Sequence, residues 1–93
     1  MEDLVLKIKE GFVLRKVMGN YVVVAVGEAS KSFRGMIKLN DTAADIWDCV
    51  MQGMDEDGIY GVLFNKYEVD GEKLRGDIRD TLESLEVNGF LER

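Results

Sequence analysis

The sequence predicts an α+β protein in which a three-stranded antiparallel sheet is followed by three helices, in a winged-helix-like order. Up to residue 39 the apolar residues fall in short β-branched and aromatic runs, which are typical of strands. From residue 40 onward they recur at spacings of three and four, the period of a helix with one buried face. This change of period predicts the element order βββααα.

The first two predicted strands form a hairpin. They are residues 12–17 and 21–26, and the short Gly-Asn connection within residues 18–20 is a hairpin signal. Because residues 21–26 are apolar throughout, this strand is predicted to be central in the sheet and covered on both faces, or nearly so. Residues 27–32 are predicted to be a loop.

A third, short strand is predicted at residues 36–39, at the edge of the sheet. Alternation places Ile37 and Leu39 on one face and Met36 and Lys38 on the other. The unpaired backbone groups of this edge would lie beside the long third helix, and such an edge can bind an extended peptide as an added strand. The shape therefore predicts a peptide-binding surface that needs no special residue.

Three helices are predicted from their cap residues and their apolar spacing. Asn40 or Asp41 can cap the first helix, which ends at Gly53, and Asp55 and Asp70 can cap the second and third. Residues 88–89 stop the third helix, and Phe90 and Leu91 are expected to fold back onto the core. The predicted apolar faces are Ala43, Ala44, Ile46, Trp47, Val50 and Met51; Ile59, Val62, Leu63 and Tyr67; and Leu74, Ile78, Leu82 and Leu85.

Few side chains are suited to catalysis or to metal binding. The chain has no histidine and a single cysteine, so it lacks the commonest general base and metal ligand, and a thiolate cluster is excluded. Cys49 lies within a predicted helix and is expected to be a small buried hydrophobe. The carboxylates at residues 55–57 lack the spacing of a calcium loop and fit a helix N-terminus. We therefore expect no enzymatic activity, no metal and no cofactor.

One domain is expected over residues 1–93, soluble and cytoplasmic. The length suits a single core, and a free thiol without a signal peptide fits a reducing compartment. No apolar run approaches the roughly 20 residues that span a bilayer, so no membrane association is expected. The formal net charge of −6 also disfavours binding to nucleic acid, which requires neutralisation of phosphates.

Several stretches share a pattern that goes beyond their periodicity. They are residues 11–15 (GFVLR), 21–29 (YVVVAVGEA) and 35–47 (GMIKLNDTAADIW), with residues 67–70, 77–78 and 85–91 further along. In this order they resemble the PqqD-like family over nearly the whole chain, and residues 35–47 are the most specific. The sequence departs from the family at Gly58 and Gly61, which weaken the second helix by about 1 kcal/mol each relative to alanine, and in lacking a proline before Gly11.

The resemblance implies a peptide chaperone. The family fold is the peptide-recognition element of many pathways that modify ribosomally made peptides. It binds the leader part of a precursor peptide and presents it to a modifying enzyme, often a radical SAM enzyme. The family's leader adds beside the third strand, in a groove against the third helix. Carried onto this sequence, the implied peptide-binding residues are Arg34, Met36, Ile37, Lys38, Arg75, Ile78, Arg79 and Leu82.

Two other classes of function stay open from the sequence. The main alternative is a winged-helix DNA-binding regulator, which has the same outline. Its recognition helix should be basic, whereas Arg75 and Arg79 are surrounded by acidic residues. The second alternative is a purely structural or antitoxin-like partner. A homodimer through the exposed edge strand is also left open.

Overall fold

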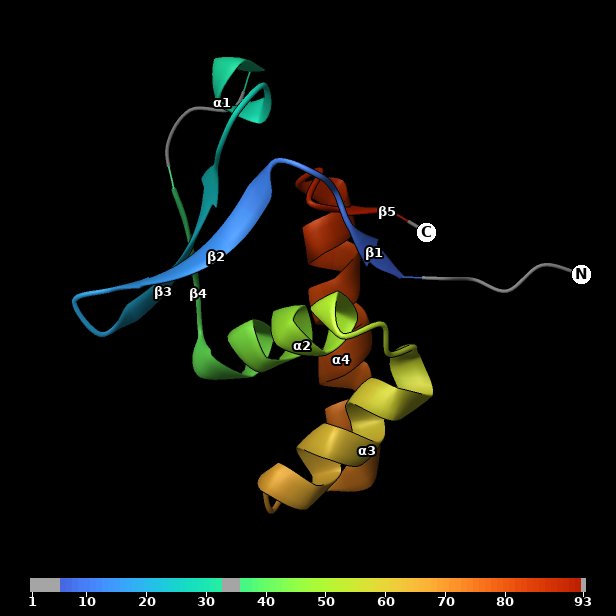
Figure 1. Cartoon of the computed structure of the whole chain (residues 1–93). Helices are drawn as coiled ribbons and strands as arrows, with labels where there is room; N and C mark the ends of the chain where they lie inside the picture. The colour runs from blue at the N-terminus through green and yellow to red at the C-terminus, as the bar shows by residue number, and fades with distance from the viewer. Residues whose placement is uncertain (1–5, 33–35, 93) are drawn as a thin grey trace, which may run out of the picture.

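A three-stranded sheet and a group of helices lie side by side in the computed structural model of this protein (Figure 1). The structure describes residues 6–32 and 36–92. It confirms the predicted fold class and adds a short helix and a pair of two-residue strands. In chain order the elements are β1 (Lys7–Ile8), β2 (Phe12–Val17), β3 (Asn20–Ala25), α1 (Ala29–Ser32), β4 (Ile37–Leu39), α2 (Asp41–Met51), α3 (Glu56–Lys66), α4 (Gly71–Val87) and β5 (Leu91–Glu92).

The larger sheet has the order β2-β3-β4 and is antiparallel throughout. Met18 and Gly19 connect β2 to β3, and both have positive φ, 51° and 83°, as in the type I′ turns that suit the twist of a hairpin. The predicted central place of the second strand is confirmed, and Val23 in its middle is fully buried. The predicted edge position of the short strand is also confirmed, since β4 pairs only with β3 among the described residues.

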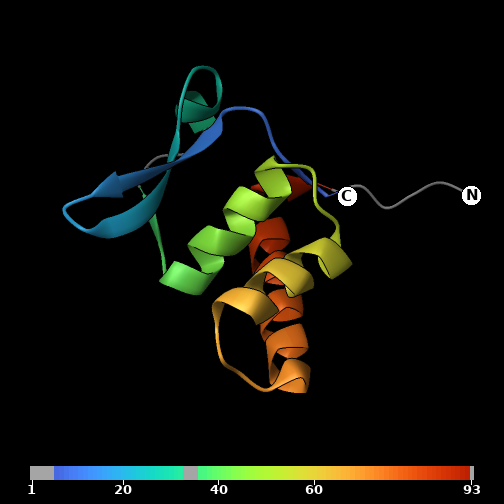
Figure 2. The ribbon, with the colours of Figure 1, turned by 60° about the horizontal axis from the view of Figure 1, so that its bottom comes forward.

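Each long helix begins at a cap residue that the sequence predicts. The side chains of Asn40, Asp55 and Asp70 each accept a hydrogen bond from the backbone N–H three residues later. Asn40 therefore caps α2, and Asp41 is its first helical residue. Figure 2 shows α2 running from the end of β4 across α4, with α3 on the other side of α2 from the sheet. The short β4–α2 connection thus brings the sheet edge close to the helices.

The core joins the helices to the inner face of the sheet around two aromatic rings. Trp47 of α2 and Phe90 meet edge to face with their ring centroids 6.0 Å apart, and Phe12 of β2 lies 4.9 Å from Phe90. The predicted return of Phe90 and Leu91 to the core is confirmed, since both are buried. The other buried members of the core are Leu6, Ile8, Val23, Leu39, Ala43, Ile46, Cys49, Val50, Ile59, Leu63, Leu74, Ile78, Leu82 and Leu85.

Three details differ from the sequence predictions. The predicted loop at residues 27–32 contains α1, a single turn in which the Ser30 hydroxyl donates a hydrogen bond to the C=O of Gly27. Met51 and Val62 were predicted on the buried faces of α2 and α3 but are 62% and 40% exposed. The ends of the described chain also pair with each other, as β1 and β5.

Candidate functional site

The free edge of the sheet is formed by β4, and the hairpin determines which of its backbone groups are unpaired. In a two-residue hairpin the residues that flank the turn, Val17 and Asn20, exchange hydrogen bonds, and so does every second pair along the ladder. The bond of 2.7 Å from the N–H of Val26 to the C=O of Gly11 fits this alternation. The residues of β3 that are not bonded to β2 therefore bond to β4. Lys38 lies opposite Val22, which is bonded to β2, so the N–H and C=O of Lys38 point to the free edge.

A hollow of about 270 Å³ lies between this edge and α4. Its residues come from the end of β4, the first turn of α2 and the second half of α4. We call it the β4–α4 groove; it is lined by Lys38, Leu39, Asn40, Ala43, Asp80, Thr81, Ser84 and Leu85.

The floor of the β4–α4 groove is apolar and its rim is polar. Leu39, Ala43 and Leu85 are buried and form the floor. Lys38 on the strand side and Asp80 on the helix side are exposed at the rim. Within the described part of the chain, neither charge has an ion-pair partner. An extended chain can therefore find backbone partners, an apolar floor and two opposite charges in one place.

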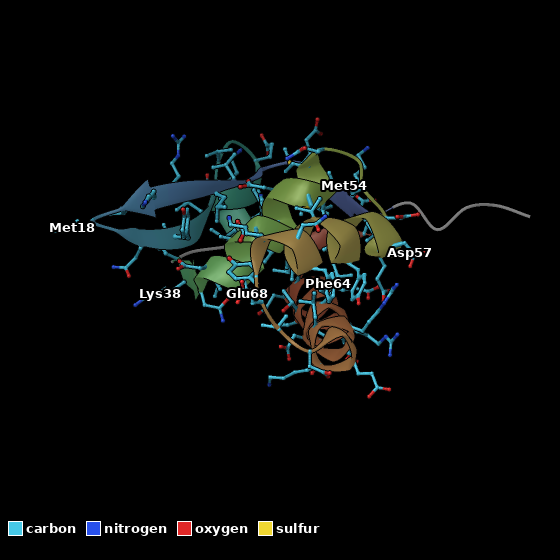
Figure 3. The ribbon with its side chains drawn as sticks, turned by 90° about the horizontal axis from the view of Figure 1, so that it is seen from below. Met18, Lys38, Met54, Asp57, Phe64 and Glu68 are labelled. Carbon is cyan, nitrogen blue, oxygen red and sulfur yellow. The ribbon has the colours of Figure 1, made fainter. Side chains whose placement is uncertain are left out.

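The strand residues implied by the resemblance lie at this edge, as far as they are described. Met36 is 63% exposed, Lys38 is exposed and Ile37 is half-buried. Arg34 lies outside the described residues. Figure 3 shows Lys38 on the sheet side of the molecule, away from the start of α3 at Asp57. The peptide-binding role of these residues stays a prediction.

Two of the implied helix residues belong to the core. Ile78 and Leu82 have no exposed surface and pack among the buried residues of the three long helices. They do not line the β4–α4 groove.

The two implied arginines lie on the other flank of α4. The Arg75 Nη1 atom is 2.8 Å from Oδ1 of Asp57 in α3, and its guanidinium lies 4.1 Å from the ring centroid of Tyr60. The hydrogen bond to Asp57 raises the pKa of Arg75. The Arg79 Nη2 atom is 3.6 Å from Oε2 of Glu56. Both arginines therefore face α3, and the structure does not bring them together with the strand edge.

The flank of α4 that does face β4 carries Asp80, Thr81 and Ser84, which the family resemblance did not indicate. At 100° per residue these side chains lie on one side of the buried stripe, whereas Arg75 and Arg79 lie on the other. The sequence does carry a signal of this polar flank, because its residues are spaced three and four apart. Spacing alone could not tell which flank faces the sheet.

A polar cluster joins α2 to the end of α3. The Tyr67 hydroxyl donates a hydrogen bond to Oδ2 of Asp45, and the Lys66 Nζ atom lies 3.0 Å from Oδ1 of the same carboxylate. These hydrogen bonds raise the pKa of both Tyr67 and Lys66. Cys49 is buried nearby, and desolvation, followed by repulsion from Asp45, raises the pKa of its thiol. The cluster links α2 to the end of α3, and burial is the main reason that the Cys49 thiol is disfavoured from ionising.

In the described part of the chain, no three side chains of the metal-binding types come together. None of the described helices is both long and apolar enough to cross a bilayer.

Comparison with known proteins identifies relatives of this fold. The family model described as coenzyme PQQ synthesis protein D (PqqD) matches residues 20–91. A search of curated proteins finds no match. Two solved structures share the fold at 22% sequence identity. One is TbiB1 in complex with the TbiA(beta) leader peptide, with a TM-score of 0.75 over 92% of this chain and 94% of that one. The other is lasso peptide synthetase B1 complexed with the leader peptide, with a TM-score of 0.76 over 95% of this chain and 98% of that one. The matched stretch takes in β3, β4 and all three long helices, and this chain belongs to the PqqD family.

Proposed function

We propose that this protein binds the leader part of a ribosomally made precursor peptide and presents it to a modifying enzyme. The leader would add as a strand to β4 and place alternate side chains in the β4–α4 groove. The observation that carries this proposal is the free edge of β4 directly beside a hollow with an apolar floor. Backbone pairing would supply affinity that tolerates many sequences, and the hollow would supply selectivity.

The relatives support the proposal. The two solved structures compared above are complexes with leader peptides. Family resemblance further suggests that the modifying enzyme is a radical SAM enzyme. We also propose that the protein acts in the cytoplasm, where a free thiol such as that of Cys49 stays reduced. The proposed role is one of binding and needs no catalytic group.

The charge of α4 weighs against DNA as the ligand. A recognition helix in the major groove presents basic or amide side chains to the bases and the phosphates. Here the flank of α4 beside the sheet carries Asp80, and the arginines of the opposite flank are paired with acidic residues of α3. Repulsion between these carboxylates and phosphates favours a peptide ligand over DNA.

The test is a proline at the free edge. A leader peptide from a short precursor gene next to the gene of this protein is titrated calorimetrically into the wild-type protein and into Met36→Pro. Met36 immediately precedes β4, and continuing the alternation back from Lys38 would direct its N–H to the free edge, where proline removes it. Loss of one edge hydrogen bond should cost about 1–2 kcal/mol, which weakens binding roughly 5- to 30-fold.

The matched control is Met36→Ala, which shortens the same side chain and keeps the N–H. It should bind the leader much more tightly than Met36→Pro does. Circular dichroism establishes that both variants are folded. If folded Met36→Pro bound the leader as tightly as Met36→Ala, strand addition at β4 would be wrong.

A further inference from the structure

The two walls of the β4–α4 groove carry opposite charges that nothing described in the chain neutralises. Lys38 lies on the outer face of the sheet, in a row with Arg15 and Val22 of the neighbouring strands. Asp80 lies at the rim on α4. Backbone pairing by itself leaves the register of an added strand undetermined, so side chains must select it.

The two charges meet different faces of an added strand. Successive side chains of a strand point to opposite faces. Residues that share a face with Lys38 extend the Arg15–Val22–Lys38 row, where an acidic side chain is favoured. Residues on the opposite face share the side of Ile37 and Leu39 and enter the hollow. There a lysine or arginine can lay its aliphatic stem on the apolar floor and reach Asp80 with its charged end.

We propose that Lys38 and Asp80 together select leader strands in which an acidic and a basic residue lie an odd number of positions apart. This inference rests on the proposed function. Only odd spacing places the two residues on opposite faces, whichever direction the added strand runs. A slip by one residue would turn the acidic residue toward Asp80 and the basic residue toward Lys38. The charges would then repel in both places, so the pair disfavours a one-residue slip of the leader.

The first experiment identifies the preferred ligands without assuming a leader. A displayed library of random short peptides is selected on the immobilised wild-type protein and, in parallel, on Met36→Pro. Peptides enriched on the wild type alone should carry acidic and basic residues at odd spacing in clear excess over even spacing. Equal frequencies of the two spacings would overturn the charge inference and leave strand addition intact. If no peptide prefers the wild type over Met36→Pro, the proposed function fails as well.

The second experiment tests the two residues with one enriched peptide, synthesised and titrated. Lys38→Glu and Asp80→Lys should each weaken its binding by roughly three- to tenfold, because each replaces an attraction by a repulsion at an exposed site. The loss should shrink at high salt. Changing the basic residue of the peptide to glutamate should restore binding to Asp80→Lys and weaken binding to the wild type.

The matched control is Glu83→Lys. Glu83 is exposed on α4 and is absent from the lining of the groove, and its reversal changes the net charge as Asp80→Lys does. Its affinity for the peptide should stay within about twofold of the wild type. If Glu83→Lys and Asp80→Lys weakened binding equally, overall charge would explain the effect and the assignment of Asp80 would be wrong.

Discussion

Replacement of Leu82 by alanine tests whether this residue belongs to the buried face of α4 or to its peptide-binding surface. Family resemblance placed Leu82 among the peptide-binding residues, whereas the structure buries it completely in the core. Leu82→Ala should therefore leave a cavity in the core and reduce stability far more than affinity for peptide.

The expected loss follows from the burial. A fully buried leucine replaced by alanine costs about 2–5 kcal/mol, through lost transfer energy and the cavity left behind. A domain of this length has a free energy of unfolding of about 5–14 kcal/mol. Over most of these two ranges the variant keeps a positive free energy of unfolding at room temperature. With a urea m-value of about 1–1.5 kcal/mol/M, its unfolding midpoint should fall by roughly 1.3–5 M.

Urea unfolding followed by tryptophan fluorescence measures the change, since Trp47 is buried in the same core. Ser84→Ala is the control, because Ser84 is exposed and lines the groove, and its unfolding free energy should stay within about 0.5 kcal/mol of the wild type. Peptide titration of the folded Leu82→Ala protein should give nearly the wild-type affinity. An unchanged urea midpoint together with lost peptide binding would refute the burial argument and return Leu82 to the binding surface.

Two further predictions concern the scaffold. Gly11→Ala should lower the free energy of unfolding by about 1–3 kcal/mol, because Gly11 has a φ of 99° and an added Cβ would lie 2.6 Å from that of Ala29. Gly76 lies in mid-helix with open space around it, so Gly76→Ala should instead raise the free energy of unfolding by about 0.5–1 kcal/mol. Urea unfolding that found Gly11→Ala more stable than Gly76→Ala would contradict both expectations. Tyr67→Phe should destabilise the protein at neutral pH, because it removes the hydrogen bond to Asp45. That bond raises the pKa of Tyr67 above its ordinary 10.0. The stability it contributes is complete below about pH 10 and is lost as the pH rises through the raised pKa, so the deficit of the variant should shrink above about pH 10. Paired melts at about pH 8 and pH 11 check it, and a constant difference would mean that the hydrogen bond contributes nothing.

The sequence predicted local features well. Asn40, Asp55 and Asp70 act through a bond to a backbone group three residues away, so their signals are complete within one helical turn. The hairpin of β2 and β3 depends on an equally local signal, although the turn residues are Met18 and Gly19, and Asn20 belongs to β3. The α+β order followed from these features and from the period of the apolar residues.

Features that depend on distant contacts were harder to predict. The pairing of β1 with β5 joins two-residue segments from opposite ends of the chain, and neither segment carries a pattern of its own. For a related reason, the sequence could not show which residues of α4 lie beside β4. Periodicity shows that Ile78 and Leu82 share the buried stripe of α4, but it cannot show which flank of that stripe meets α3 and which meets the sheet. The arginines of one flank form ion pairs with Asp57 and Glu56 of α3, and only the three-dimensional structure shows this pairing.

The shortness of β4 has a consequence for how copies of this protein behave in concentrated solution. An exposed sheet edge is a template for edge-to-edge aggregation, which natural sheets avoid with short strands and lysine side chains. Two copies pairing antiparallel about Lys38 would bring two ammonium groups together on the same face, and three residues of strand offer few hydrogen bonds in return. The edge that suits an extended peptide is thus a poor partner for itself. We expect it to stay open for ligand even where the protein is abundant.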